Sequence, residues 1–437
     1  MSIPTLQGLQ TALSGLLAEQ DALDVTGNNI ANANTEGYSR ETVVMQPSQP
    51  IAVPAISTRT GEGAQLGTGV DVQTISRIRN AYLDAQYRTQ NSSLSGASSQ
   101  TEELEQAQSA FNEPSSSGLA TQMSAFWSAW SALANAPTSE AAKQAVLSAG
   151  QQLTDTFNQL SGQLSTISTQ AQEQYAAIAG AGGQLENDAK QVAELNTQIK
   201  LAEGAGQQPN EMLDRRDELL DKLSGMAKIT VTKQPDGTDT VSFGDAGKPL
   251  VEGGKVNWPQ ELTSAAGGQL GALLSLTSPS GALAGFQSSL DKVAETLAGS
   301  VNALHTSTPF FTGTTAATLK VAVTAAQVQA SSTEAVGGNN VALAIAALRG
   351  GAAEQGYASL VEQVGSRVQG AQDEQANLQT TVTAINNQRQ SISGVSLDEE
   401  MTNLITFQRG YQASARTLTA MDAMLEQLIE HTGVVGL

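Results

Sequence analysis

Apolar residues recur in alternating steps of three and four over a long central stretch of this chain, from residue 146 to residue 199. The residues on this repeat are Val146, Leu153, Phe157, Leu160, Leu164, Ile167, Ala171, Ile178, Leu185, Val192, Leu195 and Ile199. Such spacing places them on one face of an α-helix, because a helix turns once in about 3.6 residues. A helix over the whole stretch would extend for roughly 80 Å, which is longer than a compact domain of this chain needs. The repeat therefore predicts an elongated molecule, with a bend or break at the glycines within residues 180–183.

Shorter repeats of the same kind stand at both ends of the chain. The first contains Leu6, Leu9, Leu13, Leu16, Leu23 and Ile30, and the last contains Leu397, Met401, Leu404, Tyr411, Leu418, Leu425 and Ile429. Each is a heptad seam, and the first is so short that it should be marginally stable in water without a partner. We therefore expect the N- and C-terminal helices to pair as a coiled coil, which places both ends of the chain at one end of the molecule.

The pattern changes near the middle of the chain. Residues 228–259, KITVTKQPDGTDTVSFGDAGKPLVEGGKVNWP, contain alternating runs around the PDGT sequence and further glycine turns. This period of two predicts β-hairpins. Extended segments are also expected within residues 41–80, whereas residues 306–340 allow no assignment.

These patterns predict a mainly α fold with a small β-rich insertion, built from elongated and discontinuous domains. The terminal coiled-coil domain comprises residues 1–45 and 396–437. A long helical bundle with extended segments comprises residues 46–227 and 270–395, and the small β-rich domain comprises residues 228–269.

Charge and composition exclude several classes of protein. The chain carries 22 basic and 42 acidic residues, a formal charge of −20, which argues against a nucleic-acid partner because phosphate binding needs clustered Lys and Arg. The sequence has no cysteine, so disulfides and thiolate metal sites are excluded. It has no run of 18 apolar residues, and residues 1–30 lack a basic segment followed by an unbroken apolar one. We therefore expect neither a membrane partner nor a cleaved signal peptide.

Nothing in the sequence suggests catalysis. The two histidines, His305 and His431, lie far apart and outside any metal-ligand spacing. The DEE sequence at residues 398–400 stands at a predicted helix N-terminus, where acidic side chains complement the helix dipole. The DRRDELLDK sequence at residues 214–222 is interpreted as a solvated or ion-paired helix face. We expect no catalytic residue, no cofactor, no metal site and no small-molecule substrate.

A polar stretch, GNNIANANTEGYSR at residues 27–40, follows the N-terminal repeat directly. Its characteristic residues are Asn28, Asn29, Asn32, Asn34, Thr35, Gly37 and Tyr38. Asparagine tolerates left-handed backbone and bonds to neighbouring backbone groups, so it ends helices and builds turns. Asn34 to Gly37 suits a type I turn, and Thr35 to Tyr38 suits a type II turn with Gly37 in the third position. We expect this stretch to form the corner where the N-terminal helix turns into the body of the subunit.

The same stretch resembles the N-terminal signature of flagellar axial proteins, which include rod, hook and hook-associated proteins. The C-terminal SLDEEMTNLITFQRGYQASARTLTAMDAMLEQLI, residues 396–429, resembles the matching C-terminal signature. Residues 126–160, 210–244 and 338–348 are similar to the hook-associated protein 1 family, so the resemblance covers most of the chain. One departure is Glu36, where the family commonly has a proline that would preset φ for the turn.

The resemblance implies a structural, non-enzymatic subunit that self-assembles at the hook tip as the adaptor layer between hook and filament. It implies export through the flagellar type III apparatus without a cleaved signal peptide, and hence an extracellular location in the flagellum. The implied partners are further copies of the chain, the hook protein, the next hook-associated protein and an export chaperone bound to the C-terminal helix. The terminal helices would order only on assembly, when leucines of the first repeat pack against Leu404, Tyr411, Leu418 and Leu425 within or between subunits.

Three alternatives are distinguished by particular segments. A flagellar hook or distal-rod protein would be mostly β between its ends, which the helical repeat at residues 146–199 disfavours. An enzyme carried on an axial scaffold would need an acid pair or metal ligands in residues 228–270, and none is conspicuous there. A cytoplasmic coiled-coil adaptor would leave the asparagines of residues 27–40 unexplained.

Overall fold

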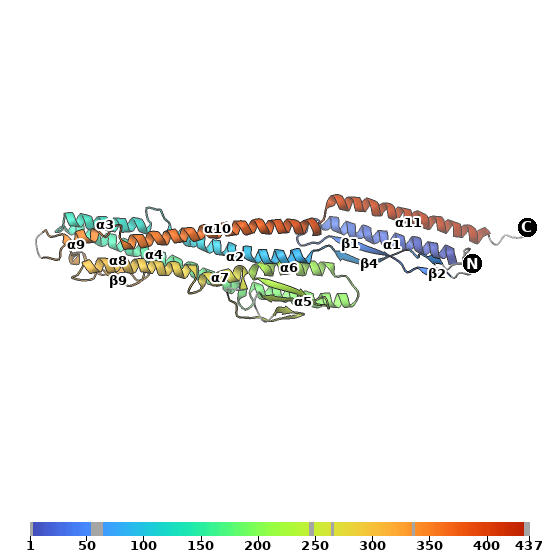
Figure 1. Cartoon of the computed structure of the whole chain (residues 1–437), viewed down its shortest axis with the longest axis horizontal. Helices are drawn as coiled ribbons and strands as arrows, with labels where there is room; N and C mark the ends of the chain where they lie inside the picture. The colour runs from blue at the N-terminus through green and yellow to red at the C-terminus, as the bar shows by residue number, and fades with distance from the viewer. Residues whose placement is uncertain (1–2, 54–63, 244–248, 264–265, 334–336, 432–437) are drawn as a thin grey trace, which may run out of the picture.

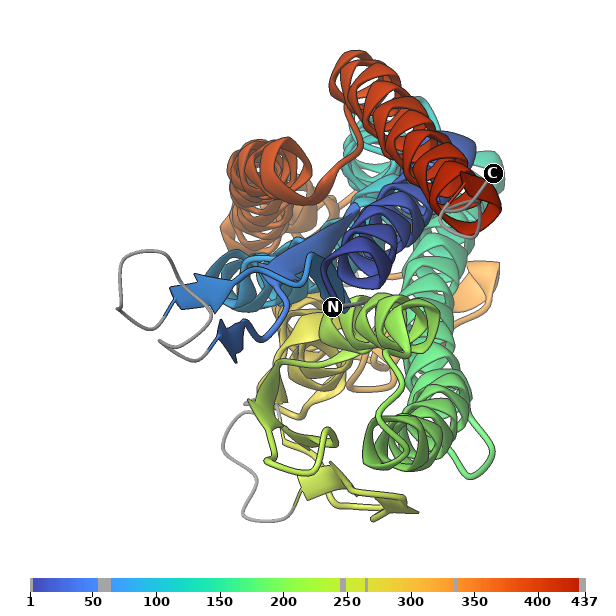
Figure 2. The same ribbon diagram turned by 90° about the vertical axis from the view of Figure 1, so that its right-hand side faces the viewer.

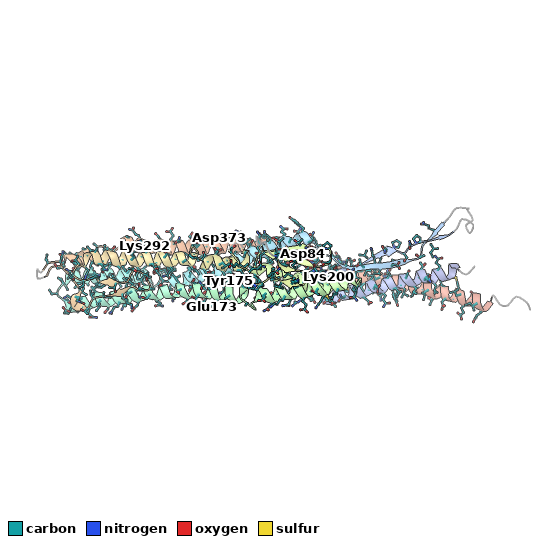
Figure 3. All side chains as sticks on the ribbon, turned by 90° about the horizontal axis from the view of Figure 1, so that it is seen from below. Asp84, Glu173, Tyr175, Lys200, Lys292 and Asp373 are labelled. Atoms are coloured by element: carbon teal, nitrogen blue, oxygen red, sulfur yellow. The ribbon has the colours of Figure 1, made fainter. Side chains whose placement is uncertain are left out.

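A computed structural model describes residues 3–53, 64–243, 249–263, 266–333 and 337–431 of the chain. The molecule is a long rod, and the N- and C-terminal helices lie side by side at one end of it (Figure 1). Figure 3 shows the same rod from below, with labelled side chains such as Lys292 and Lys200 spread along its length. The elongated, mainly α fold that the repeats predict is confirmed.

One end of the rod, hereafter the terminal unit, is built from both ends of the chain. Helices α1 (Ile3–Asn32) and α11 (Leu397–His431) pack against each other, which confirms the predicted pairing of the terminal helices. The strands of this unit are β1 (Glu41–Pro47), β2 (Ile51–Val53), β3 (Ala64–Leu66) and β4 (Val70–Arg77). β1 pairs with β4 and β2 pairs with β3, both antiparallel, and the β1–β4 pair packs along α1.

The rest of the rod, hereafter the body, is a bundle of helices. Its main helices are α2 (Ala81–Phe111), α3 (Leu119–Asn135), α4 (Glu140–Ala179), α5 (Gln184–Gly204), α6 (Asn210–Met226), α7 (Gly268–Thr277), α8 (Ala282–Leu304), α9 (Asn340–Ala346) and α10 (Ala352–Ser393). Helix α10 runs along α2, while α4 packs against α3, α7 and α8. Figure 2 looks along the rod from the end that carries both termini, with α1 and α11 in front of the bundle.

The central apolar repeat forms two successive helices, α4 and α5, with the predicted break between them. α4 ends at Ala179 and α5 begins at Gln184. Gly182 in the connection has φ +73°, a left-handed conformation that favours glycine. Every residue of the repeat is buried except Leu195, which is half-buried, so the periodicity identified the buried face of both helices correctly.

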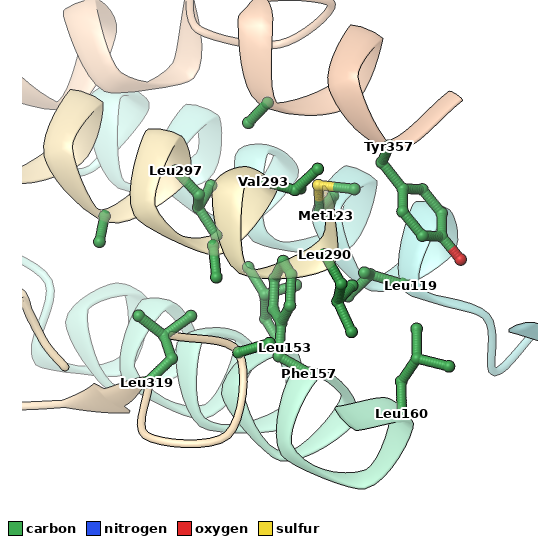
Figure 4. Close-up of a cluster of buried hydrophobic side chains, with 14 of the residues drawn as sticks. Leu119, Met123, Leu153, Phe157, Leu160, Leu290, Val293, Leu297, Leu319 and Tyr357 are labelled. Atoms are coloured by element: carbon green, nitrogen blue, oxygen red, sulfur yellow. The ribbon is translucent and has the colours of Figure 1, made fainter. Parts of the chain in front are cut away.

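A large apolar core fills the end of the body that lies away from the terminal unit. Figure 4 shows Leu153 and Phe157 of α4 close to Leu290 and Leu297 of α8, with Met123 of α3 beside them. Burying large side chains at this density stabilises the bundle by about 1.5–3 kcal/mol for each fully buried residue.

The stretch of residues 306–340 completes this core. Its described part contains the short elements β9 (Phe311–Thr312), β10 (Lys320–Val321) and a 3-10 turn at Ala325–Gln327. Phe310 and Leu319 of this stretch are fully buried in the same core as α4 and α8. This segment, with its mixed Thr, Ala and Val composition, therefore packs over the helices of the core and does not form a long helix itself.

The β-rich insertion is a four-stranded antiparallel sheet in the order β5–β6–β7–β8. Its strands are β5 (Ile229–Lys233), β6 (Asp239–Phe243), β7 (Pro249–Glu252) and β8 (Lys255–Val256). Gly237, in the predicted PDGT turn, has φ +82°. Val241 and Phe243 share a core with side chains of α5, α6 and α7, so the sheet is built onto these helices. The small insertion is confirmed, whereas the domain boundaries expected from the sequence remain a prediction.

Candidate assembly interface

The two terminal helices approach closely along a seam of small residues. A Cβ atom at Gly15 of α1 would lie 3.2 Å from Oγ of Ser414, and one at Gly410 of α11 would lie 2.6 Å from Cδ of Glu19. A Cβ atom at Gly8 would likewise meet the side chain of Met421, 2.7 Å from its Cε. Residue numbers rise on α1 as they fall on α11, so the helices are antiparallel. Gly15 leaves room for the short side chain of Ser414, whereas the ends of the flexible Met421 and Glu19 side chains lie over Gly8 and Gly410.

The predicted N-terminal seam is only partly directed at α11. Leu9, Leu16, Leu23 and Ile30 are half-buried, whereas Leu13 is 43% exposed. The side chain of Leu6 lies outside the described residues. The best-covered apolar residues of the helix are Ala12, Ala18, Ala22 and Val25. The reason is that α1 is covered on two sides, by α11 and by the β1–β4 pair, so small side chains occupy the narrow spaces.

The predicted C-terminal seam divides into two groups. Leu404, Tyr411, Leu418 and Leu425 are half-buried and lie on the side of α11 that faces α1. Leu397, Met401 and Ile429 are 51%, 51% and 76% exposed. Within one chain these three residues have little cover, and their role in assembly stays a prediction.

The asparagine motif forms a hydrogen-bonded corner centred on Asn29, which is buried. Its amide nitrogen donates to the carbonyl of Glu41 at 2.9 Å and to Oε2 of Glu400 at 3.2 Å. Its Oδ1 accepts from the backbone N–H of Glu41 at 2.9 Å and from the hydroxyl of Tyr38 at 2.8 Å. Every hydrogen-bonding capacity of this one amide is therefore used to join α1, β1 and α11.

The other motif residues shape the turn itself. Asn32 donates to the carbonyl and Oδ1 of Asn28, at 3.1 and 2.8 Å, and accepts from the hydroxyl of Thr35. The backbone N–H of Tyr38 donates to the carbonyl of Thr35, and Gly37 has φ +81°, as the third position of the predicted type II turn requires. Burial, together with the carboxylates of Glu41 and Asp214, raises the pKa of Tyr38.

The remaining motif asparagine, Asn34, is exposed. No hydrogen bond closes the expected type I turn from Asn34 to Gly37 among the described backbone bonds. The observed turn is thus the second of the two that the sequence allowed.

The acidic start of α11 has a partner that sequence reasoning missed. Glu400 is buried and accepts from Nε of Arg40 at 2.8 Å, and Glu399 accepts from Nη1 of the same arginine at 2.6 Å. These carboxylates hold the asparagine corner against α11 in addition to their position at a helix N-terminus. Arg40 directly follows the motif, but nothing in its spacing indicates a partner so far along the chain.

The charged face of α6 is ion-paired, which was one of the two interpretations of DRRDELLDK. The face consists of three carboxylates, those of Asp214, Asp217 and Asp221. The residues that pair with them are Ser39, Arg77, Arg79, Arg88 and Arg389. Asp84 belongs to the same network through its ion pair with Arg389. Burial by itself would raise the pKa of Asp217, but three surrounding arginines outweigh burial and hold the pKa at about 2.

Another face of α6 carries the buried Arg216. Its Nε lies 3.0 Å from Oδ2 of Asp239, and its Nη1 donates to Oδ1 of Asn196 and to the carbonyl of Gly237, both at 2.9 Å. Burial lowers the pKa of Arg216 and raises the pKa of Asp239, because desolvation penalises both charges more than their attraction offsets. α6 thus links the insertion to the corner.

The histidine that the structure describes, His305, has a structural role in the body. His305 is buried, with Nδ1 bonded to the carbonyl of Thr308 and Nε2 accepting from the backbone N–H of Gln329, so it supports the distal core. His431 is the last residue of α11, and its side chain lies outside the described part of the structure. Among the described residues, no cluster of His, Cys, Asp or Glu could hold a metal ion. None of the described helices has the length and apolarity to span a membrane.

The two segments that build the paired terminal helices and the asparagine corner both match family models of flagellar axial proteins. Residues 9–38 match the family model for flagella basal body rod proteins, and residues 386–430 match that for the C-terminal part of flagellar basal body rod FlgEFG proteins. Residues 104–264 match the helical domain of the flagellar hook-associated protein FlgK.

Whole-chain similarity then identifies the family. The chain is 31% identical to flagellar hook-associated protein 1 of Bacillus subtilis (strain 168), over 99% of each chain. It is 32% identical to flagellar hook-associated protein 1 of Escherichia coli (strain K12), over 56% of this chain and 43% of that one. A solved structure of the flagellar hook junction protein FlgK from Burkholderia pseudomallei matches with a TM-score of 0.46 at 25% identity, over 51% of this chain and 43% of that one.

The chain therefore belongs to the flagellar hook-associated protein 1 family. It is a structural protein of the bacterial flagellum with a role at the hook–filament junction, which removes the hook-protein and distal-rod alternatives.

Proposed function

We propose that this chain acts without catalysis, as a subunit whose terminal unit lines the inner part of a junction layer while its body faces outward. One observation carries the proposal: the paired terminal helices leave large apolar side chains uncovered. These are Leu13 and Leu17 of α1 and Leu397, Met401, Ile405, Met424 and Ile429 of α11. Uncovered apolar side chains grouped on one element mark an interaction surface.

Copies of the same chain are the partners that this surface fits. The seam between α1 and α11 covers its own leucines only by half, so a neighbouring terminal unit can complete the burial. Leu397, Met401 and Ile429 make these contacts between copies, and Leu404, Tyr411, Leu418 and Leu425 make them within a copy. Helices α1 and α11 gain stability chiefly by association, because most helical stability in proteins comes from packing of the apolar face. The terminal helices order fully when the layer forms.

The neighbours along the flagellar axis are the hook protein on one side and the next hook-associated protein on the other. The family's place at the junction supports these partners. Before assembly the chain leaves the cell through the flagellar type III apparatus without cleavage of a signal peptide. An export chaperone covers the exposed apolar residues of α11 on the way, which prevents premature association of copies.

Truncation tests this function. Purified chain lacking residues 397–437 should keep a folded body, because the body has its own apolar cores, but should fail to add to isolated hooks in electron micrographs. Filament growth from hooks supplied with the truncated chain would show that α11 is dispensable and that the proposal is wrong.

Point substitutions sharpen the test. Met401→Gln with Ile405→Gln removes apolar surface from α11 and should reduce addition to hooks, since both residues are about half exposed and contribute little inside one chain. Leu201→Gln is the matched control, because Leu201 is 70% exposed on α5 of the body. Equal addition by both variants would argue against an interface on α11.

A further inference from the structure

The terminal unit and the body meet at a joint that has little apolar packing. In the described part of the chain, no helix or strand of the terminal unit packs broadly against one of the body. Two clefts flank the joint. One, of about 890 Å³, lies between the motif loop and parts of α6 and α10, and the other, of about 520 Å³, lies between β4 and the start of α6. The chain itself crosses only before α2 and after α10.

Polar contacts across the joint converge on two carboxylates of α6. Nη1 of Arg77, at the end of β4, lies 2.5 Å from Oδ1 of Asp214 and 3.0 Å from Oδ2 of Asp217. The backbone N–H and hydroxyl of Ser39 donate to Asp214 at 2.9 and 2.6 Å. Nη1 of Arg79, in the crossing segment, lies 3.5 Å from Asp217.

The same helix is clamped from the body side by other arginines. Arg88 of α2 lies 3.0 Å from Asp217 and 2.7 Å from Asp221, and Arg389 of α10 lies 2.9 Å from Asp221. The guanidinium of Arg389 also stacks on the ring of Tyr87, 4.2 Å from its centroid. These contacts hold α6 in the body. The first two aspartates of α6, Asp214 and Asp217, make the contacts with the terminal unit.

Two further hydrogen bonds cross the joint at its edges. The side-chain amide of Asn210, at the start of α6, donates to the backbone carbonyl of Ile75 at 3.0 Å. The N–H of Arg40 donates to the carbonyl of Ser393 at 2.8 Å. The first bond borders the cleft between β4 and α6, the second borders the cleft beside the motif loop, and each would stretch if the body tilted.

We propose that Asp214 and Asp217 are positioning residues that set the angle between the terminal unit and the body, through Arg77, Arg79 and Ser39. Apolar surfaces can slide over each other at small cost, whereas charge-assisted hydrogen bonds lose energy quickly with distance and angle. The Arg77, Asp214 and Asp217 side chains are only 9%, 11% and 16% exposed, so water screens them little. The joint holds one angle because these bonds have one good geometry.

The experiment uses full-length chain added to isolated hooks and imaged by electron cryomicroscopy. In the Asp214→Asn/Asp217→Asn variant, density for the terminal unit should stay sharp while density for the body blurs. Asp221→Asn is the matched control, because it removes ion pairs of the same kind from the same helix but only within the body. Arg77→Lys, which keeps the charge, should recover most of the sharpness that Arg77→Gln loses.

A second measurement on the free full-length chain makes the test independent of assembly. Amide hydrogen exchange at Ser39 should be about tenfold faster in Asp214→Asn, which loses a charged acceptor, and unchanged in Asp221→Asn. Sharp body density in both aspartate variants, or equal blurring in both, would overturn the proposal. If even the parent chain fails to add to hooks, the assembly function itself is wrong, and the exchange rate at Ser39 alone decides the role of the joint.

Discussion

The side-chain amide of Asn29 donates a buried hydrogen bond of 3.2 Å to Oε2 of Glu400, which lies 371 residues further along the chain. The carboxylate of Glu400 also forms an ion pair with Arg40. This one carboxylate therefore joins the last turn of α1 to the first turn of α11. This point adjoins the joint with the body. It explains why an asparagine is required there: only an amide offers two donors and an acceptor in one plane at no net charge.

Asn29→Asp should destabilise the terminal unit strongly. The substitution keeps the shape, removes both donors and places a carboxylate against Glu400, at an expected cost of about 2–3 kcal/mol. Native-state hydrogen exchange of α1 and α11 measures the loss. Asn34→Asp makes the same change at an exposed position of the same stretch and should cost under about 0.5 kcal/mol. Equal effects of the two would refute the role of Asn29.

Substitutions of the glycines in α1 should have different effects, depending on what each glycine faces. Gly15→Leu puts a side chain where a Cβ would already lie 3.2 Å from Ser414, so it should separate α1 from α11. Gly27→Ala meets no atom within 4 Å and should stabilise the helix by about 0.5–1 kcal/mol. Helix content by circular dichroism and addition to hooks would report both. A harmless Gly15→Leu would mean that the helices need no close approach.

Arg216→Ala should be among the most damaging substitutions in the body. It leaves Asp239 buried without its cation, and losses of this kind cost about 3–5 kcal/mol. Urea unfolding of the body provides the measurement. Arg215→Ala, which removes a pair with Glu218 from an exposed position, should cost under about 1 kcal/mol. Adding Asp239→Asn to Arg216→Ala should restore part of the loss, since the unpaired charge is then absent.

The contribution of Asp217 to stability should depend on pH in a defined window. Its pKa is about 2 in the folded chain and about 3.9 when unfolded, so ionised Asp217 stabilises the fold fully above pH 4. That contribution, about 2–3 kcal/mol, is lost as the pH falls from about 4 to about 2. The free energy of unfolding of Asp217→Asn, which cannot ionise, should therefore approach that of the parent chain at pH 2. A difference that stays constant from pH 5 to pH 2 would contradict this assignment.

The positions of the helices and strands follow from local patterns in the sequence. The repeat at residues 146–199 identified the buried face of α4 and α5, and the alternation after residue 228 identified the sheet. The two end signatures identified the chain as a flagellar axial protein. These features are local, because a helix or strand repeats its exposure every few residues whatever it packs against.

Which residues meet, by contrast, depends on how the elements pack. Periodicity predicted a leucine seam, but α1 is covered on two sides, so Ala18 and Ala22 are buried while Leu13 is exposed. The DRRDELLDK sequence left open whether its charges are solvated or paired, and the fold brings Arg77 onto Asp214. An ion pair between residues far apart in the chain leaves no periodic trace in the sequence. Its existence depends on the path of the backbone between them, which the packing of the whole rod sets.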